Sequence, residues 1–247
     1  MSTSVRWVLA HAIYLMLIVS TLITADAQTK PTPPKPPSEN LALGEEPYHN
    51  VWGVDVLLSN GGFGLGTFYL RALTPDLSGI ISLSISESKD PREVQQFDYF
   101  GTPYTPGKLN RFLVLPLTVG IQYRLFREEI VETFRPYITA GVGPALIYEM
   151  PYATVDTTTY PVTSTIVDFF KAIGKGHSHY TATAYVGAGA NVGGSQSNVF
   201  GVNFRYYFTY LFSKGIPSLF NVYTGETSST MKDFGGFFIT VTVGLGY

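Results

Sequence analysis

The chain has 247 residues, a formal net charge of −2 and no cysteine, and aromatic residues make up 15% of it. A nearly neutral charge argues against nucleic-acid binding, which needs a basic surface. Without cysteine there are no disulfides, no thiolate metal site and no lipid-modified cysteine, so nothing in the chain depends on the redox state of its compartment.

The first 27 residues have the layout of a secretory signal peptide. Arg6 precedes an apolar run from Trp7 to Ile23, and Ala25-Asp26-Ala27 forms an A-x-A cleavage site before Gln28. A retained membrane helix is the alternative, because the run is nearly long enough to span a bilayer. The cleavage motif and the extended chain that follows favour removal. No later segment offers about 18 consecutive apolar residues, so no second membrane helix is expected.

Residues 28–50 form a proline-rich segment. The stretch from Lys30 to Pro37 is expected to be largely polyproline II, because proline fixes φ and donates no hydrogen bond. Such a stretch is a semi-rigid spacer rather than a folded domain. Two interpretations remain open: a short tether, or simply a disordered N-terminal segment of the mature chain.

Residues 51–247 contain eight segments in which apolar residues alternate with small or polar ones, the period of a β-strand. In the last segment one face is apolar throughout and ends on an aromatic residue; it consists of Phe237, Ile239, Val241, Val243, Leu245 and Tyr247. A half-buried strand of a soluble sandwich alternates in the same way but rarely ends on an aromatic residue. The eight segments are 51–60, 63–73, 79–88, 111–126, 134–148, 180–192, 199–212 and 235–247.

The connections between these segments alternate in length. Those at one end are 61–62, 89–110, 149–179 and 213–234, three of them long; those at the other end are 74–78, 127–133 and 193–198, all short. Outer-membrane barrels have long loops on one side, short turns on the other and aromatic girdles at both. The sequence therefore predicts an all-β fold: an eight-stranded antiparallel up-and-down transmembrane β-barrel, preceded by a cleavable signal peptide and the Pro-rich segment.

The strand phases predict which polar side chains point into the barrel. In 63–73 the phase is unclear near Gly64 and Gly66, and Phe68, Leu70 and Ala72 are expected to face lipid. Unpaired buried charges would cost several kcal/mol, so the inward polar residues are expected to form a hydrogen-bonded network. The excess of arginine over acid leaves two alternatives: loop carboxylates such as Glu149 enter the lumen, or arginines contact water or an anionic ligand. The predicted network is Asp55, Arg71, Gln122, Arg124, Asn203 and Arg205.

Two motifs resemble a known family, the small eight-stranded outer-membrane barrels of the OmpA/OmpW-like kind. They are the stretch from Arg135 to Ala145, Arg-Pro-Tyr followed by Gly-Val-Gly, and the closing strand 237–247. The resemblance implies export to the outer membrane of a Gram-negative bacterium, contact with outer-membrane lipids and lipopolysaccharide, and a periplasmic segment at 28–50. It also implies that the barrel-assembly machinery reads the aromatic closing strand as its signal. The resemblance does not extend to the soluble peptidoglycan-binding domain of full-length OmpA-type proteins, so stable anchoring to the cell wall is not expected.

Motifs that carry chemistry are weak. The glycine-rich stretches 61–66 and 187–194 lack the Lys-Ser/Thr ending of a phosphate loop. His177-Ser178-His179 suggests a metal site or a Ser/His hydrolase, but alternate residues of an extended chain point to opposite sides and adjacent residues are poorly placed for proton transfer. We expect no catalytic residue, no metal and no cofactor, and hence no enzyme.

A short amphipathic helix is expected within 149–179. Thr165 and Asp168 resemble a capping box, apolar residues follow at helical spacing, and Gly174 ends the run. It could cover the barrel mouth, lie on the outer leaflet, or only pack within its own loop.

Three functions remain open at the level of sequence. The first is an integral outer-membrane protein that displays its long loops, with a structural or binding role or limited passage of small molecules. The second is an OmpW-like conduit for small hydrophobic ligands, and the third is a lipid A-modifying barrel enzyme. An eight-stranded barrel is narrow enough for side chains to fill it, so a general diffusion pore is not expected. The sequence leaves the ligand and the oligomeric state open.

Overall fold

The computed structural model describes residues 49–247 except 98, 102, 128–129, 131–133, 157, 159–162, 193–197 and 225. The predicted signal peptide and nearly all of the Pro-rich segment lie outside the described residues. Within the described part of the chain, no helix is long and apolar enough to cross a membrane.

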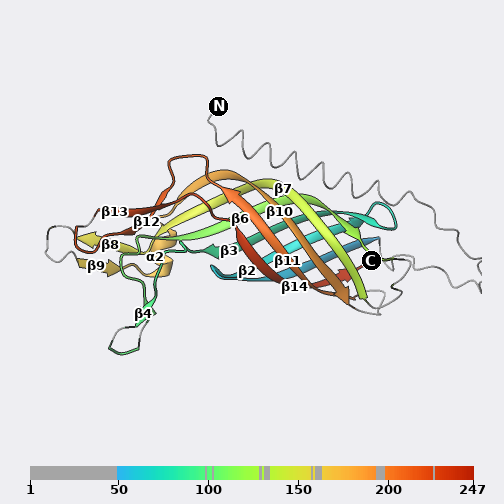
Figure 1. Cartoon of the computed structure of the whole chain (residues 1–247), viewed down its shortest axis with the longest axis horizontal. Helices are drawn as coiled ribbons and strands as arrows, with labels where there is room; N and C mark the ends of the chain where they lie inside the picture. Colours follow the sequence, from blue (N-terminus) through green and yellow to red (C-terminus); the bar gives the residue numbers. More distant parts are fainter. Residues whose placement is uncertain are drawn as a thin grey trace, which may run out of the picture. The chain divides into compact units, whose positions relative to one another are not determined.

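Eight strands form one closed antiparallel barrel in the order β1-β14-β11-β10-β7-β6-β3-β2 (Figure 1). This confirms the predicted all-β, eight-stranded fold. Each strand pairs with its neighbour in sequence, and β1 closes the sheet against β14, with Val51 opposite Gly246 and Ser59 opposite Phe238. The strands are β1 (Asn50–Ser59), β2 (Gly62–Ala72), β3 (Leu77–Ser88), β6 (Asn110–Arg124), β7 (Phe134–Pro151), β10 (His177–Val192), β11 (Asn198–Tyr210) and β14 (Gly236–Gly246).

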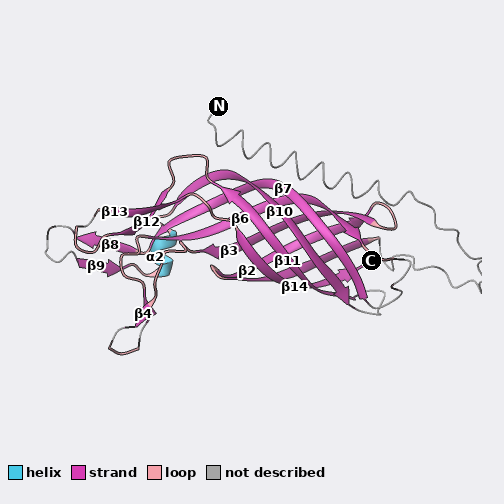
Figure 2. Cartoon of the chain, in the orientation of Figure 1, coloured by secondary structure: helices cyan, strands magenta, loops and turns pink. Residues whose placement is uncertain are grey.

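The two ends of the barrel differ. At the end that we call the turn end, short connections join β2 to β3, β6 to β7 and β10 to β11, and the C-terminus lies beside them. At the opposite end, the loop end, three long connections carry further elements that extend the molecule beyond the barrel (Figures 1 and 2). These elements are β4 (Gln96–Phe97), β5 (Pro103–Tyr104), β8 (Ala153–Asp156), β9 (Thr163–Ile166), α2 (Phe169–Ile173), β12 (Ile216–Phe220) and β13 (Thr227–Met231).

The predicted helix exists, but its cap was misplaced. Residues Thr163–Ile166 form the strand β9, which pairs with β8, so Thr165 cannot cap a helix. Asp168 is the N-cap: its side chain accepts hydrogen bonds from the backbone N–H groups of Phe170 and Lys171. The helix ends at the C-cap Gly174, as expected.

Alternation along the strands separates an apolar outer face from the interior. In β11 every second residue is buried, and the residues between them are exposed apolar side chains that face outward. The closing strand behaves in the same way, which confirms the predicted outward face of Phe237 to Tyr247. The outward residues of β11 are Phe200, Val202, Phe204, Tyr206, Phe208 and Tyr210.

The predicted phase of β2 was wrong. Phe68 and Leu70 are buried inside the barrel, whereas Arg71 is exposed on the outer face. The cause is the pairing of a large residue with a small one across β1 and β2, in which Phe68 lies opposite Gly53. A Cβ atom at Gly53 would lie 2.6 Å from the Phe68 ring, so the glycine provides the space that the ring fills. Because neighbouring residues of a strand point to opposite faces, this placement turns Arg71 outward.

The substitution Gly143→Ala tests whether the close approach of β6 and β7 matters for stability. A Cβ atom there would lie 1.9 Å from the Leu117 carbonyl oxygen, so Gly143→Ala forces the two backbones apart. We expect a destabilisation of about 1–3 kcal/mol, the usual cost of overpacking. Gly79→Ala is the matched control, because its added methyl meets nothing nearer than Leu73 at 3.6 Å. Denaturant unfolding of the refolded barrels measures both, and equal midpoints for the two variants would contradict the argument.

Candidate functional site

The barrel interior is filled by side chains rather than open. Three groups of buried apolar residues fill or close it: one at the loop end, where residues of β12 and β13 pack onto residues of the barrel strands, one near the middle and one towards the turn end. The loop-end group is Phe112, Val114, Ile147, Leu211, Ile216, Met231 and Phe234. The middle group is Leu57, Tyr185, Tyr207 and Phe238, and the turn-end group is Val51, Phe68, Leu70, Ile80 and Val199.

A buried ion pair lies at the centre of the polar part of the lumen. Arg205 Nη1 donates to Asp55 Oδ2 at 3.2 Å, and the side chains are only 4% and 3% exposed. Thr242 donates to the second carboxylate oxygen at 2.6 Å, and Asn203 donates to Thr242 at 3.2 Å. The Arg205 guanidinium also lies 5.5 Å from the centre of the Tyr185 ring. The network therefore links three consecutive strands of the barrel, β1, β14 and β11.

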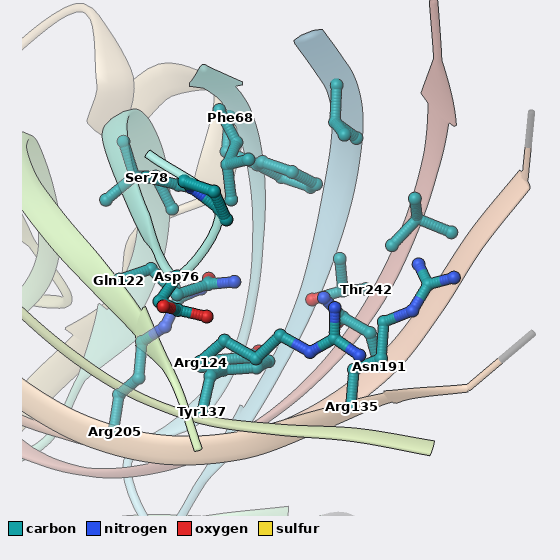
Figure 3. A pocket seen from close by; sticks show the side chains of 15 residues that line it. Phe68, Asp76, Ser78, Gln122, Arg124, Arg135, Tyr137, Asn191, Arg205 and Thr242 are labelled. Atoms are coloured by element: carbon teal, nitrogen blue, oxygen red, sulfur yellow. The ribbon is translucent and has the colours of Figure 1, made fainter. Parts of the chain in front are cut away.

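The predicted polar residues divide into three sets. Asp55, Asn203 and Arg205 share the network just described. Gln122 and Arg124 line a small cavity at the turn end, beside Asp76 and Arg135 (Figure 3). Arg71 lies outside the lumen, so its predicted inward position is corrected.

The cavity at the turn end has a volume of about 40 Å³. A water molecule needs roughly 10–15 Å³ of such space, so the cavity accommodates only a few waters. Glu149, expected as a compensating carboxylate, contacts no arginine of the described part. It lies at the loop end, where Asn110 donates to it at 2.6 Å and His179 Nε2 lies 2.8 Å away.

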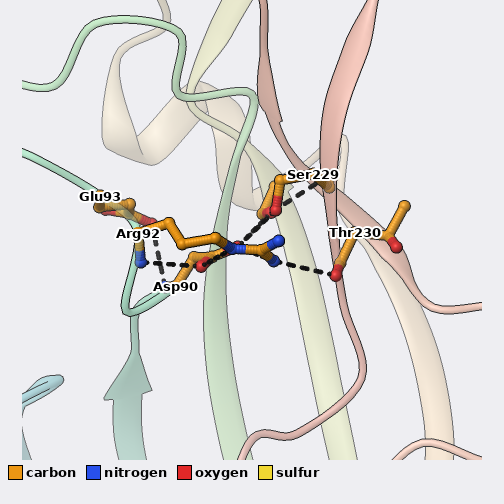
Figure 4. Close-up of polar contacts among 6 residues, drawn as sticks. Asp90, Arg92, Glu93, Ser229 and Thr230 are labelled. Atoms are coloured by element: carbon orange, nitrogen blue, oxygen red, sulfur yellow. Dashed lines mark hydrogen bonds and ion pairs between the residues drawn. The ribbon is translucent and has the colours of Figure 1, made fainter.

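A second buried polar cluster fixes the long loops to one another. The Asp90 side chain has no exposed surface; Arg92 donates to both of its oxygens at 2.9 Å, and Ser218 and Ser229 donate to Oδ2 (Figure 4). Asp90 and Arg92 follow β3, whereas Ser218 and Ser229 belong to β12 and β13. We call these four residues the latch, because they join the first long loop to the third.

Further contacts strengthen this connection and extend it to the second long loop. Lys108 forms an ion pair with Glu93 at 2.6 Å, with both side chains 6% exposed. Backbone bonds run from Leu109 N to Ser218 O and from Tyr152 N to Leu109 O. All three long loops are thereby joined into one layer above the barrel, which we call the loop layer.

Hydrogen bonding holds the pKa of Asp90 well below its usual range. Burial alone would raise this pKa, but the hydrogen bonds from Arg92, Ser218 and Ser229 together outweigh it. The latch therefore favours the ionised carboxylate.

The His177-Ser178-His179 motif lies at the start of β10. Within the described residues neither histidine hydrogen-bonds Ser178, and His179 contacts Glu149 instead. No group of three residues suited to hold a metal ion occurs in the part of the chain that the structure describes.

Several residues of these networks were missed from sequence. Thr242 lies on the inward face of a strand whose phase was predicted, and strand alternation extended to 180–192 could have identified Tyr185 as well. Asp90 and Lys108 lie in irregular loops, where no periodicity indicates which side chains are buried.

These features define a class: a closed eight-stranded barrel with a filled lumen, an apolar outer wall and a loop layer at one end. No protein-family model matches the chain, and no curated relative matches it. Among solved structures it is similar to the N-terminal β-barrel domain of OprF from Pseudomonas aeruginosa, with 12% identity, a TM-score of 0.41, and 81% of this chain and 98% of that one covered.

Two further structures show a similar overall likeness. Neisserial surface protein A shares 9% sequence identity with this chain at a TM-score of 0.41, and the match covers 80% of this chain and 94% of that one. Ail, the attachment invasion locus protein of Yersinia pestis, has 14% identity and a TM-score of 0.36, with 80% and 95% covered.

Asp55→Ala tests the lumen network. The substitution leaves the Arg205 guanidinium buried without its carboxylate, so we expect a loss of about 3–5 kcal/mol in the free energy of unfolding. Arg71→Ala removes an exposed arginine and should change that free energy by no more than about 0.5 kcal/mol. Denaturant titration of the refolded barrels compares them. An Asp55→Ala variant as stable as the native chain would show that the ion pair contributes nothing.

The latch makes a prediction about pH. Because the pKa of Asp90 is lower in the folded chain than its ordinary value of 3.8, the stabilisation is fully present above that value and declines as the pH falls below it. Hydrogen exchange of the β12–β13 amides, corrected for intrinsic rates, should therefore lose protection as the pH falls from about 4 to about 2. Asp90→Asn should have lower protection with less pH dependence. Unchanged protection of the native chain at the acidic end would disprove this role.

Proposed function

We propose that this protein is an integral outer-membrane barrel whose filled lumen serves as a rigid support for the loop layer, with a binding or structural role at the cell surface. The observation that carries the proposal is the division of every barrel strand into an apolar outer face and a packed inner one. A soluble barrel with this outer face would expose large apolar side chains to water from one strand to the next.

The dimensions support a membrane location. A tilted transmembrane β-strand needs about 9–11 residues, and the barrel strands have between 10 and 18. Closure leaves no free strand edge, which a lipid environment requires, because the bilayer core offers no water to unpaired backbone groups. Short turns at one end and long loops at the other follow the pattern of outer-membrane barrels.

The filled lumen favours support and display over transport. Beyond the small cavity at the turn end, a cavity of about 10 Å³ lies between the middle and loop-end groups, and neither has room for a solute. The conduit and the pore are therefore less well supported than the display of loops. The lipid-modifying enzyme has no support from Ser178, which is not bonded to a histidine.

The loop layer offers a surface for recognition. The latch and its neighbouring contacts fix the backbone of the loops before any partner arrives, which lowers the entropic cost of binding. The β4–β5 hairpin projects to one side of the layer (Figure 1) and carries exposed aromatic residues near its tip: Phe97 is 69% exposed, Tyr99 96% and Phe100 88%. Aromatic residues are enriched where proteins bind partners.

Cell fractionation tests the proposed location. The protein is expected in the outer-membrane fraction with an N-terminus near Gln28. Its unheated form should migrate differently from the heated form in detergent gels, because a closed hydrogen-bonded barrel resists detergent. Recovery in the soluble or inner-membrane fraction would refute the proposal.

The last strand tests assembly. Tyr247 is exposed on the outer face, whereas Gly246 points to the interior side. Deletion of Tyr247, or Tyr247→Asp, should lower the amount of folded protein in the outer membrane more than Gly246→Asp does, because an interfacial aromatic anchor is lost. Immunoblots of unheated membranes measure the folded amount. Normal levels of the Tyr247-deleted chain would contradict a role for this residue in assembly.

A further inference from the structure

A groove on the outer wall of the barrel has the properties of a ligand site. It lies at the loop end, crosses from β2 over β3 to β6, and is bordered by the helix α2. Its volume is about 380 Å³, within the range of about 300–1,000 Å³ that is usual for small-molecule sites. The apolar side chains that line it include Phe63, Leu65, Ile85, Leu113, Met150 and Phe169.

The groove lies beside a short interruption of the strand ladder, and of its lining residues only Ile85 falls within that interruption. The β3–β6 pairing runs to Leu83 opposite Leu117 and resumes at Ser86 opposite Val114. Pro116 lies within this interval and has no N–H group to donate to β3. Most of the groove lies over paired strands, with Leu65 opposite Ile85 and Glu87 opposite Leu113, so strand pairing fixes the backbone beneath it.

One charged side chain at the rim, Arg111, has no acidic partner among the residues that the structure describes. The Arg111 guanidinium lies 4.9 Å from the centre of the Tyr152 ring and 5.8 Å from that of Phe169. These rings hold it beside the groove, and within the described residues it forms no ion pair. Glu87 is the acid in the lining, and its carboxylate has Lys89 at 4.0 Å. Arg111 is thus positioned to bind an anion from outside the chain.

We infer that this groove binds one acyl chain of an outer-leaflet lipid with a net negative headgroup, with Arg111 contacting the phosphate of the same lipid. An apolar recess on the lipid-facing wall requires an apolar occupant, and a cation at its outer rim lies at the depth of the headgroups. Arginine suits this position, because its stem packs against apolar surface while its guanidinium binds phosphate in a forked geometry. This inference rests on the proposed membrane location.

The test uses tryptophan fluorescence. In a chain carrying Trp7→Phe and Trp52→Phe, which removes both native tryptophans, Phe63→Trp places one reporter in the groove. Phe208→Trp places a matched reporter on β11, which lies across the barrel from β3. The two phenylalanines are 66% and 54% exposed, and both lie towards the loop end. Leu65→Trp serves as a second groove reporter. Each chain is refolded into phosphatidylcholine vesicles.

The measurement is how strongly lipids with brominated acyl chains quench the fluorescence of each tryptophan reporter. Brominated phosphatidylglycerol, which is anionic, is compared with brominated phosphatidylcholine, which has no net charge. The groove reporters should favour the anionic lipid by about two- to fivefold, the size expected for one partly exposed ion pair. Phe208→Trp should show no preference, and adding Arg111→Gln should remove the preference at the groove. Equal quenching by the two lipids at the groove reporters, or a preference that survives Arg111→Gln, would overturn the inference. If neither lipid quenches any reporter, the proposed membrane location itself is wrong.

Discussion

The structure depends on closure of a single antiparallel sheet. The pairing of β1 with β14 removes the two free edges that an open sheet would have. In a closed sheet every residue faces either inward or outward, so the period-two alternation of the strands becomes a division between two environments. Apolar residues are placed outside and packed or polar residues inside. The proposed function follows from this division, because an apolar outer face of this extent is suited to lipid, whereas the inner face requires partners for its charges.

Inside the barrel, residue size and charge are matched across strands. Gly53 leaves room for the Phe68 ring, and Asp55 on the same strand receives the Arg205 guanidinium from β11. Buried charges are tolerated only when paired, so the lumen polar groups join one another and leave little free volume. At the loop end Asp90 is a second buried carboxylate whose charge is compensated, because it accepts hydrogen bonds from residues of two loops. The barrel and the loop layer are thus each held by one buried carboxylate with several donors.

Sequence predicted the barrel well because alternation and loop length are local, repeated signals. The strand count, the outward face of 237–247 and the inward positions of Asp55, Asn203 and Arg205 all followed from it. The failures have identifiable causes. Arg71 was placed inside because glycines at 62, 64 and 66 hide the phase of β2, and that phase is set by a contact with β1. Thr165 was taken as a helix cap because the pairing of β8 with β9 is not visible in either segment alone. The latch could not be predicted, because it joins residues more than a hundred positions apart in irregular loops.

The central claim is that the outer wall contacts lipid while the alternate residues do not. Because the chain has no cysteine, single cysteines can be introduced along β11 from Phe200 to Tyr210 and labelled with a nitroxide in vesicles. The measurement is the accessibility of each label to oxygen, which concentrates in lipid, and to a water-soluble nickel complex. A period-two pattern is predicted, with high oxygen and low nickel accessibility at Phe200, Val202, Phe204, Tyr206 and Phe208. Nickel accessibility at these five positions as high as in the loops would contradict the account.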